Sequence, residues 1–125
     1  MKIEELYASI GGNYNEVHSR LISEKIISKF ICKFPNDPTF GQLMDALMKG
    51  DEDAVFRAVH TLKGVCANLG LTKLSGLASD VTEMYRPGQE ALRVDEKAKV
   101  SELKTCYEDT IAKINQFAAE NGMEV

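Results

Sequence analysis

Apolar residues recur along most of this chain at helical spacing, and this periodicity constrains the fold more than any other feature of the sequence. Steps of three and four residues place side chains on one face of a helix, whereas a half-buried strand requires alternation, which no segment sustains. We therefore expect an all-α fold. The clearest seam, with steps of four, three, four and three, comprises Val55, Val59, Leu62, Cys66 and Leu69.

The first third of the chain is expected to hold a short helical segment and a long helix. The short segment, 3–10, ends at Gly11–Gly12, and Asn13 with Glu16 three residues later resembles a capping box. The long helix should end near residue 34, because Pro35 removes a backbone donor and restricts its neighbour. Its apolar positions are Val17, Leu21, Ile22, Ile26, Ile27, Phe30, Ile31 and Phe34.

Capping and breaking residues delimit the helices that follow. Asp37 before Pro38 predicts a helix start, and Gly50 predicts the end of that helix. The next helix opens with the acidic run 51–53 at its positive dipole end and stops at Gly70. Thr72 is expected to cap a helix that ends at 86–88, an Arg-Pro-Gly sequence.

The polar stretch 89–97 is compatible with either a loop or an extra helical turn, and a last helix follows it. Amphipathic helices with short connections pack as neighbours in antiparallel bundles. We therefore predict an antiparallel up-down four-helix bundle with an additional short N-terminal helical segment, formed by residues 1–125 as a single domain. The apolar positions of the last helix are Val100, Leu103, Tyr107, Thr110 or Ile111, Ile114 and Phe117.

Charge and composition restrict the possible partners and the compartment. A net charge of -4 and a pI near 5.2 disfavour nucleic-acid binding, so protein partners are expected. Cys32, Cys66 and Cys106 are widely spaced and are expected to be buried, reduced thiols, although Cys32 or Cys106, if exposed, would permit a disulfide-linked dimer. Without a signal sequence or an apolar span, we expect a cytoplasmic protein that does not bind membranes, and the initial Met1 favours a free-standing protein.

The most informative residue is His60, which is placed on the outer face of the third main helix. Relative to Val59 and Cys66 on the core seam, His60 should point toward solvent. Its neighbours one and two turns away are Phe56, Lys63, Gly64 and Ala67. An exposed histidine beside a lysine is most often ordinary solvated surface, so its setting must decide its role.

Gly64 and Lys63 both favour a chemical role for His60. A glycine inside a helix costs about 1 kcal/mol relative to alanine, so local stability does not explain Gly64. Its missing side chain would let another protein approach His60 closely. Neutral imidazole is a nucleophile, and a cation one turn away, Lys63, can offset charge on a phosphoryl group.

These residues resemble the histidine-containing phosphotransfer (HPt) domain family. The run His60-Thr61-Leu62-Lys63-Gly64 is similar to the family pattern H-x-[LI]-K-G, and 68–71, Asn-Leu-Gly-Leu, resembles the turn that follows it. Leu74 and Leu77 fit the next helix. Upstream, the similarity includes 34–40, Leu43 and 50–51, so it covers most of the chain.

The resemblance implies a phosphoryl carrier in a multistep two-component relay, and such carriers are usually monomers. His60 would be phosphorylated on Nε2 and would exchange the group with the aspartate of a response-regulator receiver domain or a hybrid histidine kinase. Lys63 would stabilise the phosphoryl charge, and Phe56, Gly64 and Ala67 would contact the partner. The partner would supply the aspartate and Mg²⁺, so no cofactor or metal is expected on this chain, and no nucleotide-binding loop suggests autokinase activity.

Two departures from the family pattern and one alternative remain. Val65 and Cys66 are bulkier than the small residues common after the glycine. On the facing helix, Thr82 stands where the family often has a glutamine or glutamate that bonds the histidine, and Glu83 or a bridging water is a possible substitute. The alternative function is a helical adaptor that binds a kinase or receiver domain without being phosphorylated. His18 is expected to be ordinary surface.

Overall fold

The computed structural model describes all 125 residues and contains helices but no strand, which confirms the all-α prediction. Two short 3₁₀ helices, η1 and η2, accompany seven α-helices. In chain order the elements are α1 (Ile3–Ser9), α2 (Tyr14–Leu21), α3 (Glu24–Lys33), η1 (Phe34–Asn36), α4 (Thr39–Lys49), α5 (Glu52–Asn68), α6 (Thr72–Tyr85), η2 (Glu90–Asp95) and α7 (Glu96–Glu120).

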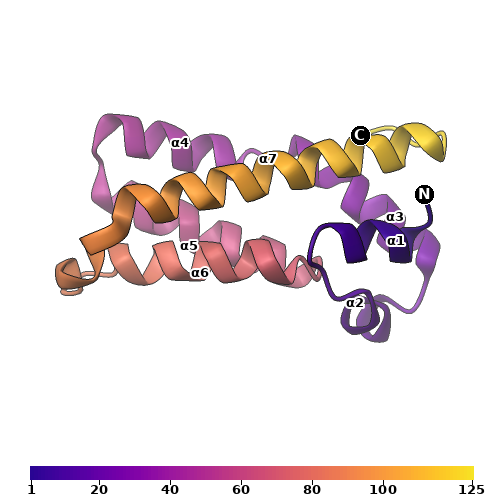
Figure 1. Ribbon diagram of the computed structural model, residues 1–125, viewed down its shortest axis with the longest axis horizontal. Coiled ribbons are helices and arrows are strands. Elements are labelled where there is room, and N and C mark those ends of the chain that lie inside the picture. The colour runs from indigo at the N-terminus through magenta and orange to yellow at the C-terminus, as the bar shows by residue number, and fades with distance from the viewer.

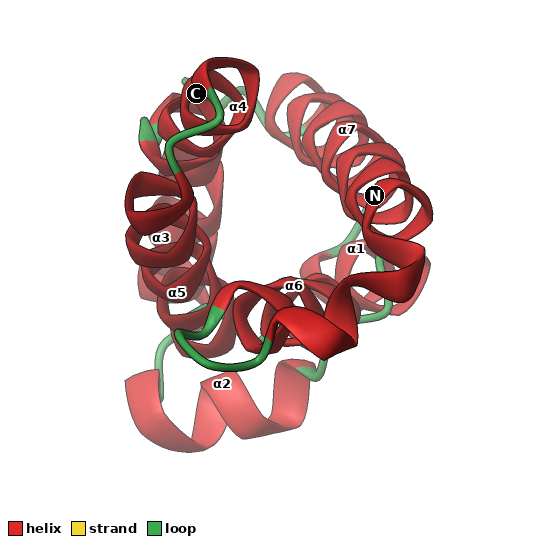
Figure 2. Cartoon of the chain, turned by 90° about the vertical axis from the view of Figure 1, so that its left-hand side faces the viewer, coloured by secondary structure: helices red, strands yellow, loops and turns green.

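The four longest helices run along the long axis of the molecule (Figure 1). Helices that follow one another in the chain are packed together: α4 against α5, α5 against α6, and α6 against α7. Seen from the end, these four helices surround a common centre (Figure 2). The three N-terminal helices lie at the opposite end of the molecule from η2, beside the last turns of α7 (Figure 1).

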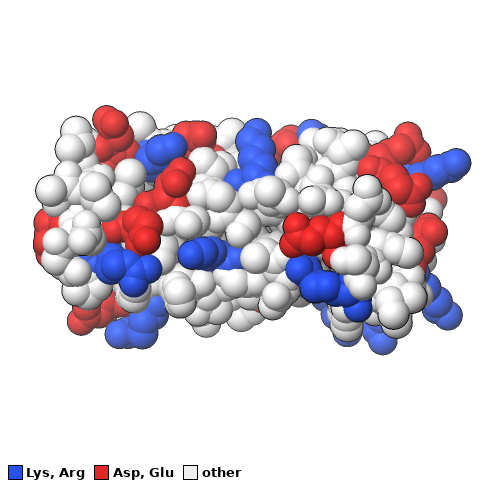
Figure 3. Space-filling model, turned by 90° about the horizontal axis from the view of Figure 1, so that it is seen from below, with Lys and Arg blue, Asp and Glu red and all other residues white.

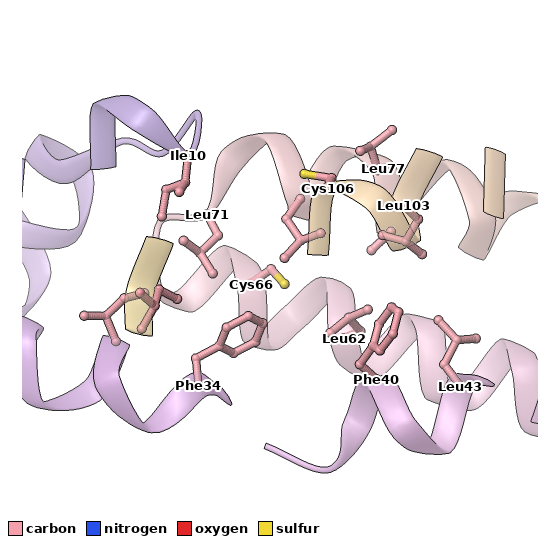
Figure 4. Close-up of a cluster of buried hydrophobic side chains, with 14 of the residues drawn as sticks. Ile10, Phe34, Phe40, Leu43, Leu62, Cys66, Leu71, Leu77, Leu103 and Cys106 are labelled. Carbon is pink, nitrogen blue, oxygen red and sulfur yellow. The ribbon is translucent and has the colours of Figure 1, made fainter. Parts of the chain in front are cut away.

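Apolar side chains from the seven α-helices and from η1 meet in one core, to which η2 contributes none. The predicted seam of α5 is confirmed: Val55, Val59, Leu62 and Cys66 are buried, and Leu69 is half-buried. Figure 4 shows Leu62 and Cys66 facing side chains of the flanking helices. Burying the α5 seam supplies a large share of the stabilisation, since an apolar side chain of this size contributes roughly 1.5–3 kcal/mol when fully buried. The burial also fixes which face of α5 remains outside.

The starts of α4 and α5 agree with the sequence, whereas the start of α6 differs. Asp37 Oδ1 accepts the backbone N–H of Thr39 at 2.8 Å, and Asp51 Oδ1 accepts that of Ala54 at 3.1 Å. The prediction that Thr72 caps α6 was wrong, because Thr72 is the first residue of the helix and makes no capping bond. The stretch 89–97 contains η2, so the extra-turn interpretation holds.

The long helix predicted from residue 13 to residue 34 is broken, which corrects the sequence interpretation. Ile22 has a φ of 63°, and the Ser23 side chain accepts the N–H of Ile26 to start α3. The chain changes direction at the break, and α2 and α3 each bury one side in the core. As a result Ile22, Ile26 and Phe30, which were expected in the core, are exposed.

The turn between α5 and α6 is held against the N-terminal segment. Gly70 has a φ of 70°, and a Cβ there would overlap the Val17 side chain, so only glycine permits this approach. The Tyr7 hydroxyl donates to the Leu69 carbonyl oxygen at 2.7 Å. Arg20 Nη2 donates to the carbonyl oxygens of two residues at the C-terminal end of α5, Ala67 and Asn68. The end of α5 is therefore fixed from outside by α1 and α2.

The three cysteines are buried and unpaired, as the sequence predicted. Burial raises the pKa of Cys66 to about 12, because an apolar environment disfavours the thiolate. Cys32 and Cys106 are not exposed, so the condition for a disulfide between two copies is not met.

Candidate functional site

His60 lies on the solvent-exposed face of α5, near the middle of the helix. Its neighbour Val59 is fully buried, and Leu62 on the next turn is also buried, so the core fixes the rotation of α5 about its axis. The imidazole is thereby held outward on a rigid element rather than on a loop. This placement agrees with the prediction from the sequence.

An aromatic stack orients the imidazole. The ring of Phe56, one turn earlier on α5, is parallel to that of His60, with 5.9 Å between centroids and 11° between planes. The guanidinium of Arg86, just after α6, lies 5.5 Å from the centre of the Phe56 ring. Phe56 is half-buried, so it joins the core to the exposed histidine. Stacking of this kind limits the rotation of the imidazole.

Lys63 and Gly64 lie one turn after His60 on the same face. The Lys63 side chain forms no ion pair, although its backbone carbonyl accepts a hydrogen bond from the Ser75 hydroxyl at 3.2 Å. A Cβ at Gly64 would meet no atom within 4 Å, so no packing inside the chain requires the glycine. Ala67, one turn further along, is exposed. The face beside His60 thus combines a free cation with an open, nearly bare stretch of helix.

Glu83 on α6 completes the charged surroundings of His60. Its carboxylate accepts a hydrogen bond from Arg86 Nε at 2.6 Å, and this bond holds the pKa of Glu83 below its usual value. Lys63 and His60 lower the same pKa to a smaller extent. Lys63, Glu83 and Arg86 are therefore the charged residues of the His60 surface, with Arg86 joined to Glu83 and lying over the Phe56 ring.

Thr82, one candidate for a partner of His60 on the facing helix, forms no hydrogen bond with the histidine. Thr82 is fully buried, and its hydroxyl donates to the carbonyl oxygen of Ala78 within α6 at 2.7 Å. The next residue, Glu83, points outward instead, as the sequence analysis allowed. Thr82 is therefore a core residue of α6.

A comparison with families of known proteins decides the identity of the chain. A family model described as Hpt domain matches residues 36–113, which is more than half of the chain. The chain belongs to the Hpt domain family. The matched range contains His60, Lys63 and Gly64. No curated protein and no solved structure matched the chain significantly.

Membership of the Hpt family implies histidine phosphotransfer in phosphorelays, with receiver and kinase domains of two-component systems as partners. Hpt domains carry phosphoryl groups and are not enzymes in general. Within this Hpt domain, no three His, Cys, Asp or Glu side chains are grouped to hold a metal ion. None of its helices has the length and apolar character that a membrane crossing requires.

Sequence reasoning missed one residue of the site and did not assign another. Arg86 was read only as part of a helix-ending sequence, and Glu83 only as a substitute for Thr82. Both become neighbours of the histidine because α6 packs along α5. The sequence did hold a signal for their mutual contact, since an acid and a base three residues apart share one side of a helix.

Proposed function

We propose that this Hpt domain carries phosphoryl groups on His60 in a multistep two-component relay. The observation that supports this most strongly is the combination on one exposed helix face of His60, the unpaired Lys63 and the open position at Gly64. A core-facing histidine or a crowded neighbour would prevent a receiver domain from reaching the imidazole.

The proposed reaction is one phosphoryl transfer between two proteins. Nε2 of neutral His60 attacks the phosphorus of an aspartyl phosphate on the receiver, a nitrogen–phosphorus bond forms, and the bond to the aspartyl oxygen breaks. The aspartate leaves as a free carboxylate. The reverse reaction passes the group to the next receiver, and Mg²⁺ belongs to the receiver in both directions.

Each neighbour of His60 has a proposed part in this transfer. Lys63 offsets the negative charge of the phosphoryl oxygens, which is greatest during transfer. Phe56 keeps the imidazole plane fixed and, with Gly64 and Ala67, contacts the receiver. Because Gly64 has no side chain, the partner can approach the backbone of α5 beside the reacting nitrogen.

We also propose the finer organisation that accompanies this function. Residues 1–125 form a single domain in which α4, α5, α6 and α7 constitute an antiparallel up-down bundle. The protein acts as a monomer in the cytoplasm, where receiver domains reach it, and it has no autokinase activity.

The test is transfer from a phosphorylated receiver domain with Mg²⁺ to the wild type, to His60→Gln and to His18→Gln. His18 lies on exposed α2 and is a matched control. We expect acid-labile, base-stable label on the wild type and on His18→Gln, and none on His60→Gln, whose circular dichroism should be unchanged. A wild type that binds receivers but accepts no label from any of several would instead support the adaptor function.

A further inference from the structure

One side of α3 carries apolar side chains that the rest of the chain does not cover. Ile26 and Phe30 are each 42% exposed, and Ile22, just before the helix, is 75% exposed. Single exposed apolar residues are common, but Ile26 and Phe30 are one turn apart on α3 and form an apolar row on one face, and Ile22 lies just before the helix begins. The opposite side of α3 is buried in the core, so the row is not a sign of a loosely attached helix.

A row of three lysines runs beside the apolar row. Lys25, Lys29 and Lys33 are exposed and have a spacing of four residues. Lys25 and Lys29 directly precede Ile26 and Phe30, and Lys33 lies about one turn after Phe30. None of them forms a salt bridge, whereas Lys49, Lys99 and Lys113 each pair with a carboxylate. Figure 3 shows Lys and Arg groups along the lower right of the molecule, at the end that holds α1 to α3.

This α3 surface, composed of Ile22, Lys25, Ile26, Lys29, Phe30 and Lys33, is separate from the phosphotransfer site. Helix α3 packs on α2, η1 and α7 and has no comparable contact with α5, which bears His60. Figure 1 places α3 at the end of the molecule beyond α5. Helix α3 also precedes the range 36–113 that the Hpt family model matches. A partner bound here would leave the histidine face open.

We propose that the α3 surface binds an acidic amphipathic α-helix of another protein. An apolar row with a period of four accepts the apolar anchors of a helix that lies along it. The lysine row meets carboxylates on the flank of such a helix, and its unpaired state means that no internal ion pair must be broken first. A concentration of positive charge on one helix of a chain with net charge -4 selects an acidic partner.

Two other occupants fit the observations less well. A membrane surface would require apolar side chains that project from the protein, whereas Ile26 and Phe30 are more than half covered. A second copy of this chain would have to present the acidic segment η2, where Leu92 and Val94 are exposed, at the opposite end of the molecule. Such head-to-tail contacts join copies into rings or open chains rather than a closed pair.

The inference goes beyond phosphotransfer and does not depend on it. A helix bound at α3 would tether its protein to the Hpt domain while His60 engages a receiver. Tethering raises the local concentration of the second protein without adding contacts at the transfer site. The α3 surface would then determine which partners meet at the domain rather than how fast the chemistry proceeds.

The experiment measures binding of a fluorescent synthetic helix of about 18 residues, long enough to form several turns. The peptide carries leucines every three or four residues with glutamates on both flanks, and a second peptide carries lysines in place of glutamates. Fluorescence anisotropy is recorded against the full chain at low and high salt. We expect the glutamate peptide alone to bind, more weakly at high salt.

Two triple variants with equal net charge provide the decisive comparison. Lys25→Glu/Lys29→Glu/Lys33→Glu should weaken binding by roughly tenfold or more, and Phe30→Ser should also weaken it. The control Lys73→Glu/Lys97→Glu/Lys104→Glu changes exposed lysines without ion pairs elsewhere and should bind almost as well as the wild type. Circular dichroism confirms that all variants are folded.

Four results would overturn the proposal. Absence of binding by the glutamate peptide, or equal loss in both triple variants, would remove the role of the α3 surface. Lysine-dependent sedimentation with phosphatidylserine vesicles, without peptide binding, would assign the surface to membranes. Concentration-dependent association of the wild type that Phe30→Ser abolishes would assign it to a second copy.

Discussion

The ring of Phe56 lies almost parallel to the imidazole of His60, with 5.9 Å between the ring centroids. Such a stack resists rotation of the imidazole about its Cβ–Cγ bond. We predict that Phe56→Leu, which keeps an apolar side chain but loses the flat ring, slows phosphorylation of His60 several-fold. The free energy of unfolding should fall by only about 1 kcal/mol. The transfer rate is measured by quenching the reaction at successive times, and the stability by denaturant unfolding. An unchanged transfer rate would show that the stack does not orient the histidine.

Glu83 should report on the charges around His60. Its pKa is lowered first by the hydrogen bond from Arg86 and then by the charges of Arg86, Lys63 and His60. We predict that Arg86→Gln raises the pKa of Glu83 more than Lys63→Gln does, in a carboxyl-detected NMR titration. The control Arg57→Gln removes a cation on the same helix as His60 that does not affect Glu83 and should leave its pKa in place.

Gly64 should be unfavourable for stability and favourable for transfer. Because a Cβ there meets no neighbour, Gly64→Gln should raise the free energy of unfolding by about 0.5–1 kcal/mol through helix propensity. The same change should slow transfer from a phosphorylated receiver by blocking its approach. Gly41→Gln on α4 is the matched control, since its Cβ also meets open space. It should stabilise the protein similarly without slowing transfer. Normal transfer by Gly64→Gln would refute the clearance argument.

Gly70 should behave in the opposite way. A Cβ at this position would overlap Val17 and approach the carbonyl oxygen of Asn13 at 2.9 Å, and the φ of 70° adds strain. We predict that Gly70→Ala destabilises the protein by more than about 2 kcal/mol. Gly88 has a similar positive φ, but a Cβ there would meet no other atom. Gly88→Ala therefore measures the backbone strain alone, which should lower the free energy of unfolding by about 1–2 kcal/mol. Equal losses in thermal unfolding would mean that the contact with Val17 is not important.

The buried thiol of Cys66 predicts a dependence of stability on pH. Its pKa in the folded protein is about 12, above the ordinary value of 9.0 that it regains on unfolding. The unfolded chain therefore releases this proton first, so the contribution to stability is complete below pH 9 and is lost as the pH rises toward 12. The loss is about 1.4 kcal/mol per pH unit for one group.

Denaturant unfolding from pH 8 to 10.5 measures this dependence. Cys66→Ala lacks the thiol and should show a smaller decrease across that range, although it is less stable at pH 8 because of the cavity left behind. Parallel decreases in the wild type and the variant would show that other groups account for the alkaline instability.

The sequence predicted the features that depend on one helix and missed those that depend on two. The α5 seam, the exposure of His60 and the closeness of Phe56 follow from helical periodicity alone. The register between α5 and α6 does not, so the sequence left Thr82 and Glu83 as alternative partners of His60 and gave Arg86 no role. The break at Ile22 was missed because Leu21 and Ile22 continue the apolar pattern across it. Only the capping serine, Ser23, marked a new helix start.

Helix α7 joins the two ends of the molecule. Its 25 residues extend over roughly 37 Å, at 1.5 Å per residue, and contact α6 near one end and α1 and α3 near the other. Neither end can open independently without breaking this helix or withdrawing its buried side chains. Amide protons in the middle of α7 should therefore exchange with solvent deuterium only when the whole chain unfolds. We therefore expect the N-terminal helices and the histidine-bearing helix to unfold together, as one cooperative unit.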